Sequence, residues 1–352
     1  MIFATVLRVL KPVIAVLLAL LVGALVITLA GADPLTAYAA LFHGAFIDYY
    51  GLGATLVKTG PILLAGLAVI IPLRVGLLNV GGEGQIYIGG LATAAVALYC
   101  PADWPGPVVM GLSILAGALG GGAWAGIAGY LKAYRGLNEV IVTILLNYVA
   151  INMVSYVAGG PMMQPGAPYP YSKEIRDDVW LPWIMDGTDA HAGVIVALAL
   201  AIIVFLALRF TTVGYAMNAI GKSPRAAEYA GMSVKHVIVG SMFTAGAIAG
   251  LAGAFEVLGL KYRLYHLFNP GYGYDGIVAA FLAGLNPLAL PIAALFVGGL
   301  KAGAAIMQRA IGLESTVVEV IQGLVIVFVA ASLAIGRFRL PAWRKGKPKG
   351  SD

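Results

Sequence analysis

The chain has 352 residues and a mean hydropathy of +0.92, and only 11% of its residues are charged. Soluble proteins carry about a quarter charged residues, so this composition excludes an ordinary soluble protein. It predicts an all-α polytopic membrane protein that forms one transmembrane domain over residues 1–352. Cys100 is the only cysteine, which excludes a disulfide within the chain and a metal site made of several thiolates.

Ten apolar segments are candidate crossings, and all but the short eighth, 275–286, are close to the roughly 20 residues that a bilayer crossing needs. The first follows Arg8 and Lys11 and resembles a signal peptide, but its apolar run Val13–Ala30 is long and no convincing cleavage site follows it, so we expect a retained span. We expect broken or re-entrant segments near 76–86 and 270–287, where glycine-rich turns interrupt the apolar pattern. The ten predicted crossings are 12–30, 54–73, 84–100, 107–131, 139–158, 191–209, 237–258, 275–286, 288–306 and 317–336.

The positions of lysine and arginine predict the orientation. With the N-terminus inside, most of the 22 basic residues fall on one side, which the positive-inside rule assigns to the cytoplasm. Both termini and the loop 210–236 are then cytoplasmic, and the longest loop of the opposite face is 159–190. Trp180 and Trp183 of that outer loop are interpreted as an interfacial anchor. The basic residues assigned to the cytoplasm are Arg8, Lys11, Arg74, Lys132, Arg135, Arg209, Lys222, Arg225, Lys235, Arg337, Arg339, Arg344, Lys345, Lys347 and Lys349.

The C-terminal basic cluster Arg337–Lys349 fits either a nucleic-acid site or an anchor among anionic lipid headgroups. In a chain of spans the lipid anchor is favoured, so we expect contact with membrane lipid and none with nucleic acid. Small residues also repeat at four-residue spacing in two predicted spans, which allows close helix packing inside the chain or in a dimer, and internal packing is favoured. These residues are Gly117, Gly121, Gly122, Gly126 and Gly129 in one span, and Gly246, Gly250 and Gly253 in the other.

A polar stretch, Gly221–Met232, separates two apolar segments on the predicted cytoplasmic side. Ser223 can cap a helix, and Pro224 suits its first position because the missing N–H would have no partner there. Gly231 can end this helix in the left-handed conformation. Such a short capped helix predicts a knob held by another protein.

Two sequence patterns resemble nucleotide-binding motifs, but the strands that such motifs require are not predicted around them. Ala216–Ser223 fits a loose phosphate-loop pattern, but an apolar span precedes it instead of a strand. Gly271–Gly276 spells G-x-G-x-x-G without a βαβ unit, and it is interpreted as an outer-face turn. The four histidines fall on separate loops, so we expect no metal site, no cofactor on this chain and no enzymatic activity.

Polar side chains at membrane depth are better candidates for function, because their burial in lipid is costly. Asn79, Glu83 and Gln85 surround the break before the third span, and Asn147 lies in the fifth. We predict that these four residues line a substrate path, with interhelical hydrogen bonding as the alternative. Glu256 and Glu83 are the carboxylates that an ion-coupled transporter would need.

Several stretches resemble ABC importer permeases of the branched-chain amino acid, simple sugar and nucleoside family. Gly76–Gln85 resembles G-L-F-N-I-G-x-E-G-Q, and Asn138–Tyr148 resembles N-E-V-I-x-T-I-M-L-N of the nucleoside, basic membrane protein-dependent branch. Pro270–Ile277 is similar to P-G-x-G-F-D-G-I, and Ile321–Gly323 matches the last span. Ala226–Gly231 resembles the A-A-x-x-x-G core of the loop that docks on the ATPase, although Arg225 replaces the usual Glu.

This resemblance implies about ten helices and three partners. They are an ABC ATPase with two nucleotide-binding halves, a second homologous permease and an extracytoplasmic substrate-binding lipoprotein. ATP-Mg would be bound by the ATPase and not by this chain. The implied docking residues are Lys222, Ser223, Pro224, Arg225, Ala226, Ala227, Glu228 and Gly231.

The expected function is therefore that of the permease subunit of an ATP-driven importer in the bacterial inner membrane. The segment that begins at Asn138 favours nucleosides as substrates, by similarity alone. Simple sugars such as ribose are the alternative, and an ion-coupled secondary transporter is a weaker one.

Overall fold

The computed structural model describes residues 17–312, 320, 323–324 and 327–328. The predicted span 317–336 lies largely outside these residues. Arg8, Lys11, Ile321 and Gln322 and the cluster Arg337–Lys349 lie entirely outside them.

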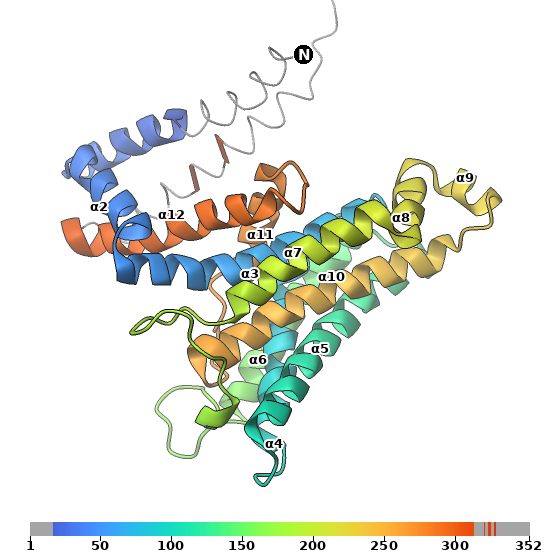
Figure 1. The fold of residues 1–352 in the computed structure, drawn as a ribbon, viewed down its shortest axis with the longest axis horizontal. Coiled ribbons are helices and arrows are strands. Elements are labelled where there is room, and N and C mark those ends of the chain that lie inside the picture. Colours follow the sequence, from blue (N-terminus) through green and yellow to red (C-terminus); the bar gives the residue numbers. More distant parts are fainter. Residues whose placement is uncertain (1–16, 313–319, 321–322, 325–326, 329–352) are drawn as a thin grey trace, which may run out of the picture.

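The described chain folds into helices joined by turns and three isolated β-bridges (Figure 1). Six helices are long and apolar enough to cross a membrane, which supports a polytopic membrane protein, but they do not confirm the predicted count of about ten. The helices are α2 (Pro34–Phe46), α3 (Tyr49–Leu73), α4 (Gly82–Tyr99), α5 (Gly106–Arg135), α6 (Glu139–Gly159), α7 (Gly193–Phe210), α8 (Thr212–Lys222), α9 (Pro224–Tyr229), α10 (Val234–Glu256), α11 (Tyr272–Leu282) and α12 (Leu290–Ile311), with a further helix Leu17–Leu29, a 3₁₀ turn Asp177–Val179 and a π turn Val257–Lys261.

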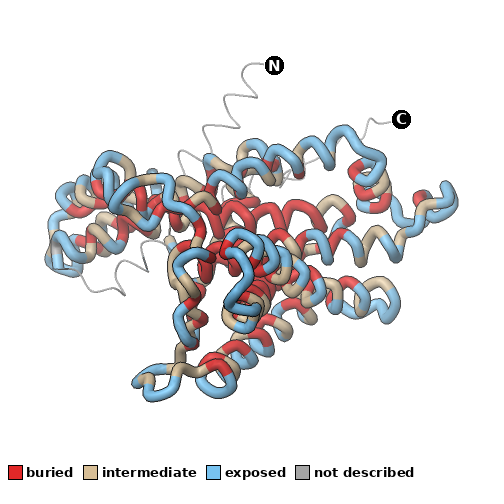
Figure 2. The backbone as a smooth tube through the Cα atoms, turned by 60° about the horizontal axis from the view of Figure 1, so that its bottom comes forward, coloured by how far each residue is buried: buried red, intermediate tan, exposed pale blue. Residues whose placement is uncertain are grey.

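Helix α3 is the centre of the bundle. It packs against α10 on one side and against α11 and α12 on the other, and α7 also lies against it. Helices α4, α5, α6 and α10 form one group, and α2, α11 and α12 form another. The buried stretches gather in the middle of the bundle (Figure 2), because α3 is apolar all round and is buried almost throughout.

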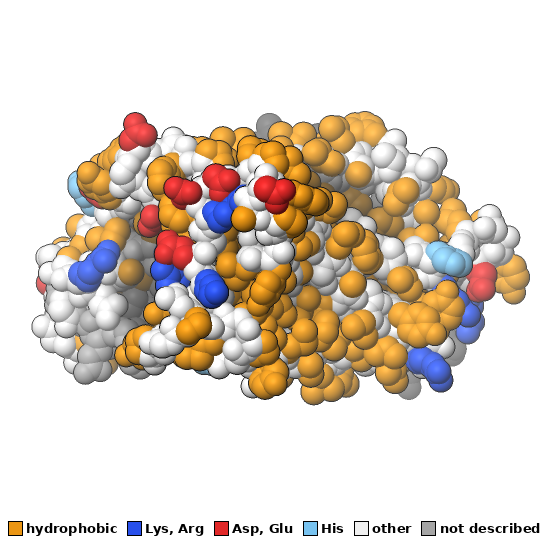
Figure 3. All heavy atoms as spheres, turned by 90° about the horizontal axis from the view of Figure 1, so that it is seen from below, with side chains coloured by type: hydrophobic (Ala, Val, Ile, Leu, Met, Phe, Trp, Pro, Cys, Tyr) orange, Lys and Arg blue, Asp and Glu red, His pale blue; other side chains and the backbone are white. Residues whose placement is uncertain are grey.

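The predicted outer loop and the loop around α9 lie at opposite ends of the molecule. Helix α7 begins at Gly193, directly after the outer loop, and ends at Phe210, directly before α8 (Figure 1). Figure 3 shows charged side chains in two groups separated by an expanse of hydrophobic side chains. This separation is what a membrane-spanning chain requires, since charged groups avoid the hydrocarbon core.

Glycines bring the backbones of α5 and α10 into contact. A Cβ atom added at Gly121 would lie 2.4 Å from the Gly246 carbonyl oxygen, and one at Gly250 would lie 2.2 Å from the Gly117 carbonyl oxygen. The small-residue faces therefore serve internal packing between these helices, as predicted.

Three features differ from the sequence-based expectation. Helices α2 and α8 were not predicted, because α2 is only 13 residues long and α8 is a short amphipathic helix. The stretch Gly271–Gly276 was predicted to be an outer-face turn, which is wrong. It forms the start of α11, and Tyr272, Gly273 and Gly276 are buried there.

The close contact of α5 and α10 gives a stability prediction. We expect Gly250→Ala to lower stability by about 1–3 kcal/mol, because the methyl group must separate two packed backbones. Gly240→Ala on the same helix is the matched control, since a Cβ there meets nothing within 4 Å. Thermal unfolding of the purified chain in detergent checks this. Equal unfolding temperatures for the two variants would contradict the packing.

Candidate functional site

The candidate site is built around a break in the helical chain between α3 and α4. Residues 74–81 follow the end of α3 without forming a helix, and Gly76 takes a left-handed conformation with φ +82°. Helix α4 then begins inside the bundle, with Glu83 in its first turn. Such a break leaves backbone groups without helical partners, and inside a membrane protein other protein groups must supply them.

Asn79 and Gln85 close the break with a reciprocal amide pair. Nδ2 of Asn79 donates to Oε1 of Gln85 at 3.0 Å, and Nε2 of Gln85 donates to Oδ1 of Asn79 at 2.9 Å. Asn79 also donates to the Ala68 carbonyl at 3.2 Å and accepts from the Gly81 N–H at 3.0 Å. All the hydrogen-bonding capacity of the Asn79 amide is therefore used within the protein.

Asn147 of α6 joins the same network from the other side. Its Oδ1 accepts from the Gly84 N–H at 2.8 Å, and its Nδ2 donates to the Val80 carbonyl at 2.9 Å. The hydroxyl of Tyr274 lies 3.5 Å from the same nitrogen. Gly84 is required by this contact, because a Cβ there would lie 2.9 Å from the Asn147 Cα. The amide thus binds α6 to the first turn of α4.

Glu83 connects the start of α4 to the start of α11. The Gly273 N–H donates to its Oε2 at 2.9 Å, and a Cβ on Gly273 would lie only 2.2 Å from the Glu83 nitrogen. The two helix N-termini therefore meet in the bundle. Each carries a partial positive charge that a carboxylate stabilises.

The structure thus brings together all four residues predicted to line a substrate path. Asn79, Glu83, Gln85 and Asn147 are buried, with exposed fractions of 3% or less. Their hydrogen bonds go largely to backbone groups or to one another, which is the interhelical bonding that the sequence left as an alternative. A role on the substrate path stays a prediction for this cluster.

The predicted knob is helix α9, whose caps are those expected from the sequence. The Ser223 hydroxyl accepts from the Ala226 N–H at 3.3 Å, and Pro224 is the first helical residue. Gly231 has φ +82°, and a Cβ there would meet nothing within 4 Å, so glycine is needed for its backbone conformation and not for space. Ala227 is buried, whereas Tyr229 is 94% exposed. The helix lies at the tip of the bundle (Figure 1).

Comparison with known proteins assigns the family. Residues 51–330 match the family described as the permease component of the branched-chain amino acid transport system. The chain belongs to this permease family. It is a transport component and not an enzyme.

The permease is similar to three curated proteins over nearly its whole length. It is 38% identical to a guanosine ABC transporter permease of Bacillus subtilis, with 93% of this chain and 94% of the relative aligned. It is 35% identical to a glucose ABC transporter permease of Haloferax volcanii, with 94% and 89% aligned. It is 31% identical to a nucleoside ABC transporter permease of Lactococcus lactis, with 93% and 92% aligned.

Sequence reasoning missed a charged pair inside the permease. Lys301 of α12 pairs with Asp275 of α11, and its Nζ also donates to the Pro270 carbonyl at 3.0 Å. Nζ lies 5.4 Å from the ring centre of Tyr272. Asp275 was interpreted as part of an outer-face turn, so its pairing with Lys301 was not foreseen. Lys301, the only charged residue in the predicted crossing 288–306, was a signal that could have found the pair.

Two further charged groups belong with this pair. Lys58 of α3 lies within electrostatic reach of Asp275, Lys301 and Glu256. Glu256 is fully buried, and neither of its carboxylate oxygens has a hydrogen-bond partner in the described part of the chain. Ionisable groups in the interior of a membrane protein are candidates for function. The fully buried Glu256 and the half-buried Lys58, Asp275 and Lys301 therefore join the buried cluster as candidates.

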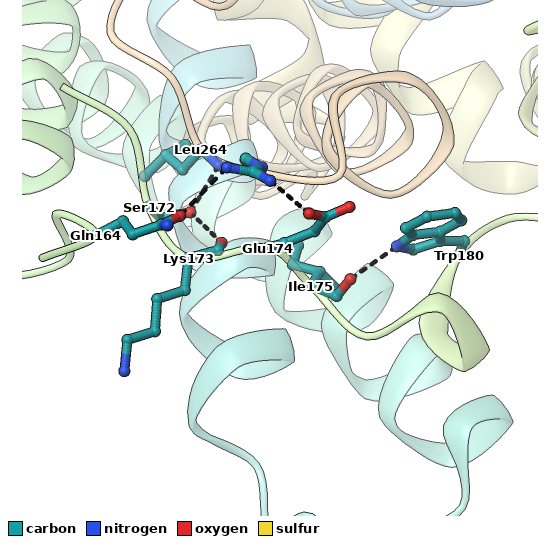
Figure 4. A network of polar contacts seen from close by, with 8 residues as sticks. Gln164, Ser172, Lys173, Glu174, Ile175, Trp180 and Leu264 are labelled. Atoms are coloured by element: carbon teal, nitrogen blue, oxygen red, sulfur yellow. Dashed lines mark hydrogen bonds and ion pairs between the residues drawn. The ribbon is translucent and has the colours of Figure 1, made fainter. Parts of the chain in front are cut away.

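The outer loop is bonded to the residues that follow α10 and its π turn. Figure 4 shows Gln164, Ser172 and Glu174 gathered beside Leu264. Arg263 donates to Gln164 Oε1 at 3.2 Å and pairs with Glu174, while the Leu264 N–H donates to the Ser172 hydroxyl at 3.0 Å. These contacts hold the loop in a defined shape over the predicted outer face.

The two tryptophans of this loop differ. Trp180 stacks on Tyr262 with ring centres 4.0 Å apart and donates to the Ile175 carbonyl at 2.9 Å. It therefore packs between the loop and the residues that follow α10, which the anchor interpretation did not foresee. Trp183 is 58% exposed. His191 at the end of the loop is buried, which lowers its pKa to about 4 and keeps the ring neutral. Its Nδ1 accepts from the Gly193 N–H at 3.2 Å, at the start of α7.

No metal site is evident in the part of the chain that the structure describes, since no group of three or more His, Cys, Asp or Glu side chains could hold an ion there. The stretch Ala216–Ser223, which fits a loose phosphate-loop pattern, lies almost wholly within helix α8. Its backbone N–H groups are therefore engaged in helical bonds and cannot form a phosphate cradle.

The amide network predicts a structural effect of Asn79. We expect Asn79→Ala to destabilise the permease by about 1–3 kcal/mol, because buried partners of the amide lose their hydrogen bonds. Asn152→Ala on α6 is the control, since that exposed amide donates only to the Tyr148 carbonyl. Thermal unfolding of the purified chain measures both. If Asn79→Ala unfolds at the normal temperature but abolishes uptake, the residue acts on the substrate and not on the fold.

Proposed function

We propose that this permease is the membrane subunit of an ATP-driven importer for nucleosides. The observation that carries the proposal is the 38% identity, over 93% of the chain, to a permease whose name specifies guanosine. The relative named for nucleosides aligns over a similar share of the chain. The family match supports such a subunit over an ion-coupled transporter.

A sugar is the second candidate substrate. The permease is 35% identical to a protein named for glucose, which is close to its identity with the guanosine relative. Nucleosides and simple sugars are both neutral and both carry sugar hydroxyls. A site with hydrogen-bonding groups would suit either class.

The proposed importer contains an ABC ATPase with two nucleotide-binding halves, a second homologous permease and an extracytoplasmic substrate-binding lipoprotein. This chain would form a single domain of about ten spans in the bacterial inner membrane, with both termini cytoplasmic. ATP-Mg would be bound by the ATPase alone. The charge distribution supports this orientation, because Arg74, Lys132, Arg209 and Arg225 lie at the end of the bundle that carries α9.

Helix α9 is the proposed docking element for the ATPase. Lys222, Arg225, Glu228 and Tyr229 are exposed there, and the caps fix the helix as a compact unit. Tyrosine is enriched among the residues that dominate protein interfaces, so an exposed Tyr229 at this tip suits a docking role. A rigid knob also transmits displacement to the helices that flank it.

Tyr229 tests the docking role directly. We expect Tyr229→Ala to weaken association with the ATPase by about tenfold or more, because an interface aromatic is lost. Uptake should fall while the amount of permease in the membrane stays normal. Tyr169→Ala is the matched control, since Tyr169 is 71% exposed in the outer loop at the opposite end. Co-purification and uptake measure the effect, and normal values for Tyr229→Ala would exclude this residue from docking.

Uptake competition tests the substrate class. Cells that express the complete transporter should take up labelled guanosine, and unlabelled adenosine or uridine should compete. Glucose and ribose should not compete at the same concentrations. Competition by glucose with no effect of the nucleosides would assign the permease to sugars instead, while leaving the docking role of α9 intact.

A further inference from the structure

A cavity of about 480 Å³ opens where α3 and α7 end and α8 begins, beside the turn between α11 and α12. Its polar lining consists of Arg74, Arg209, Tyr215, Asn218 and Asn286, and no acidic residue lines it. The volume falls within the range of about 300–1,000 Å³ that is usual for small-molecule sites. The lining offers hydrogen-bond donors and two positive charges, which suits an anion.

The two arginines have no acidic partner among the residues that the structure describes. The four ion pairs of this part of the chain involve other side chains. Arg74 Nη2 donates to the Leu285 carbonyl at 3.1 Å, which fixes the guanidinium at the wall of the cavity, while its Nε is buried with no protein partner. An arginine held in this way retains donors for the oxygens of a phosphate.

The apolar part of the lining indicates the source of the anion. Phe205 and Leu208 of α7 line the cavity beside the arginines. They belong to the last turns of a predicted span, and Leu206 and Phe210 beside them are 47% and 73% exposed. If α7 crosses the membrane, its last turns lie where acyl chains give way to headgroups, which places the cavity at that level and beside an exposed apolar surface. Basic pockets between spans at this level bind anionic headgroups.

The walls of the cavity are preformed. A Cβ on Gly214 would lie 2.3 Å from the Leu208 carbonyl oxygen, and one on Gly221 would lie 2.1 Å from the Arg74 carbonyl oxygen. Helix α8 is therefore packed tightly against the ends of both α7 and α3. The lining residues Tyr215 and Asn218 lie on α8, which leads directly into the cap of α9 at Ser223.

We propose that this cavity binds the phosphate headgroup of an anionic phospholipid. The guanidinium groups of Arg74 and Arg209 pair with the phosphate oxygens, and the two asparagine amides accept and donate hydrogen bonds at the glycerol part. The acyl chains lie along Phe205, Leu208 and the exposed side of α7. This site does not depend on which solute the permease carries.

Native mass spectrometry of the purified, delipidated full-length chain tests the site. We expect phosphatidylglycerol to bind about tenfold or more tightly than phosphatidylcholine, because only the former adds a net charge for the arginines. Arg209→Gln should remove most of this preference without altering the unfolding temperature, since Arg209 is exposed and forms no ion pair among the described residues. Arg74→Gln should have the same effect on binding.

The control removes charge at the same end of the molecule but outside the cavity. Arg135→Gln and Arg225→Gln together should leave the lipid preference unchanged, since both residues are exposed and neither lines the cavity. Equal binding of phosphatidylglycerol and phosphatidylcholine would overturn the proposal. An equal loss of the lipid preference in the control variant would also overturn it, because the preference would then come from the overall positive charge of this end and not from the cavity. Displacement of phosphatidylglycerol by inorganic phosphate at comparable concentrations would assign the site to a free phosphate and overturn the lipid.

Discussion

Buried backbone N–H and C=O groups need hydrogen-bond partners within the protein, and this requirement determines the structure at the centre of the permease. A continuous helix meets it without help, but the chain stops being helical for several residues after α3. The side-chain amides of Asn79, Gln85 and Asn147 take the place of the missing helical bonds. Since each side-chain amide both donates and accepts, these three neutral residues supply hydrogen bonds to the backbone groups of the break.

This solution determines where α4 and α11 can begin. Both helices start inside the bundle at glycines, and the Glu83 carboxylate lies between their N-termini. Neighbouring helices shelter α4, with α5, α6 and α10 packed around it. It can therefore carry a polar first turn that a lipid-facing helix could not carry. The sheltered position of α4 is thus sufficient to explain why the third predicted span carries polar residues.

The sequence predicted those structural features that depend on residues close together in the chain. Ser223, Pro224 and Gly231 specify α9 within a few residues, and the glycine-rich stretch near 76–86 marks the break. Contacts between elements that are far apart in the sequence were harder to predict. The pair of Asp275 and Lys301 depends on α11 packing beside α12, and the position of each residue in its own segment does not reveal the other. Helix α2 was missed because its 13 residues fall short of a crossing, although α12 and α3 cover it in the fold.

The break and helix α9 are connected by packing. A Cβ on Gly221, at the end of α8, would lie 2.1 Å from the Arg74 carbonyl oxygen and 3.4 Å from the Val75 Cα. Helix α8 therefore rests on the first residues of the break, and only the cap at Ser223 separates it from α9. Because packed interfaces shift between discrete arrangements instead of stretching, a displacement of α9 by a partner would reach the break through α8. The elements held there by amides, α4, α6 and α11, would then have to move together or exchange their hydrogen bonds.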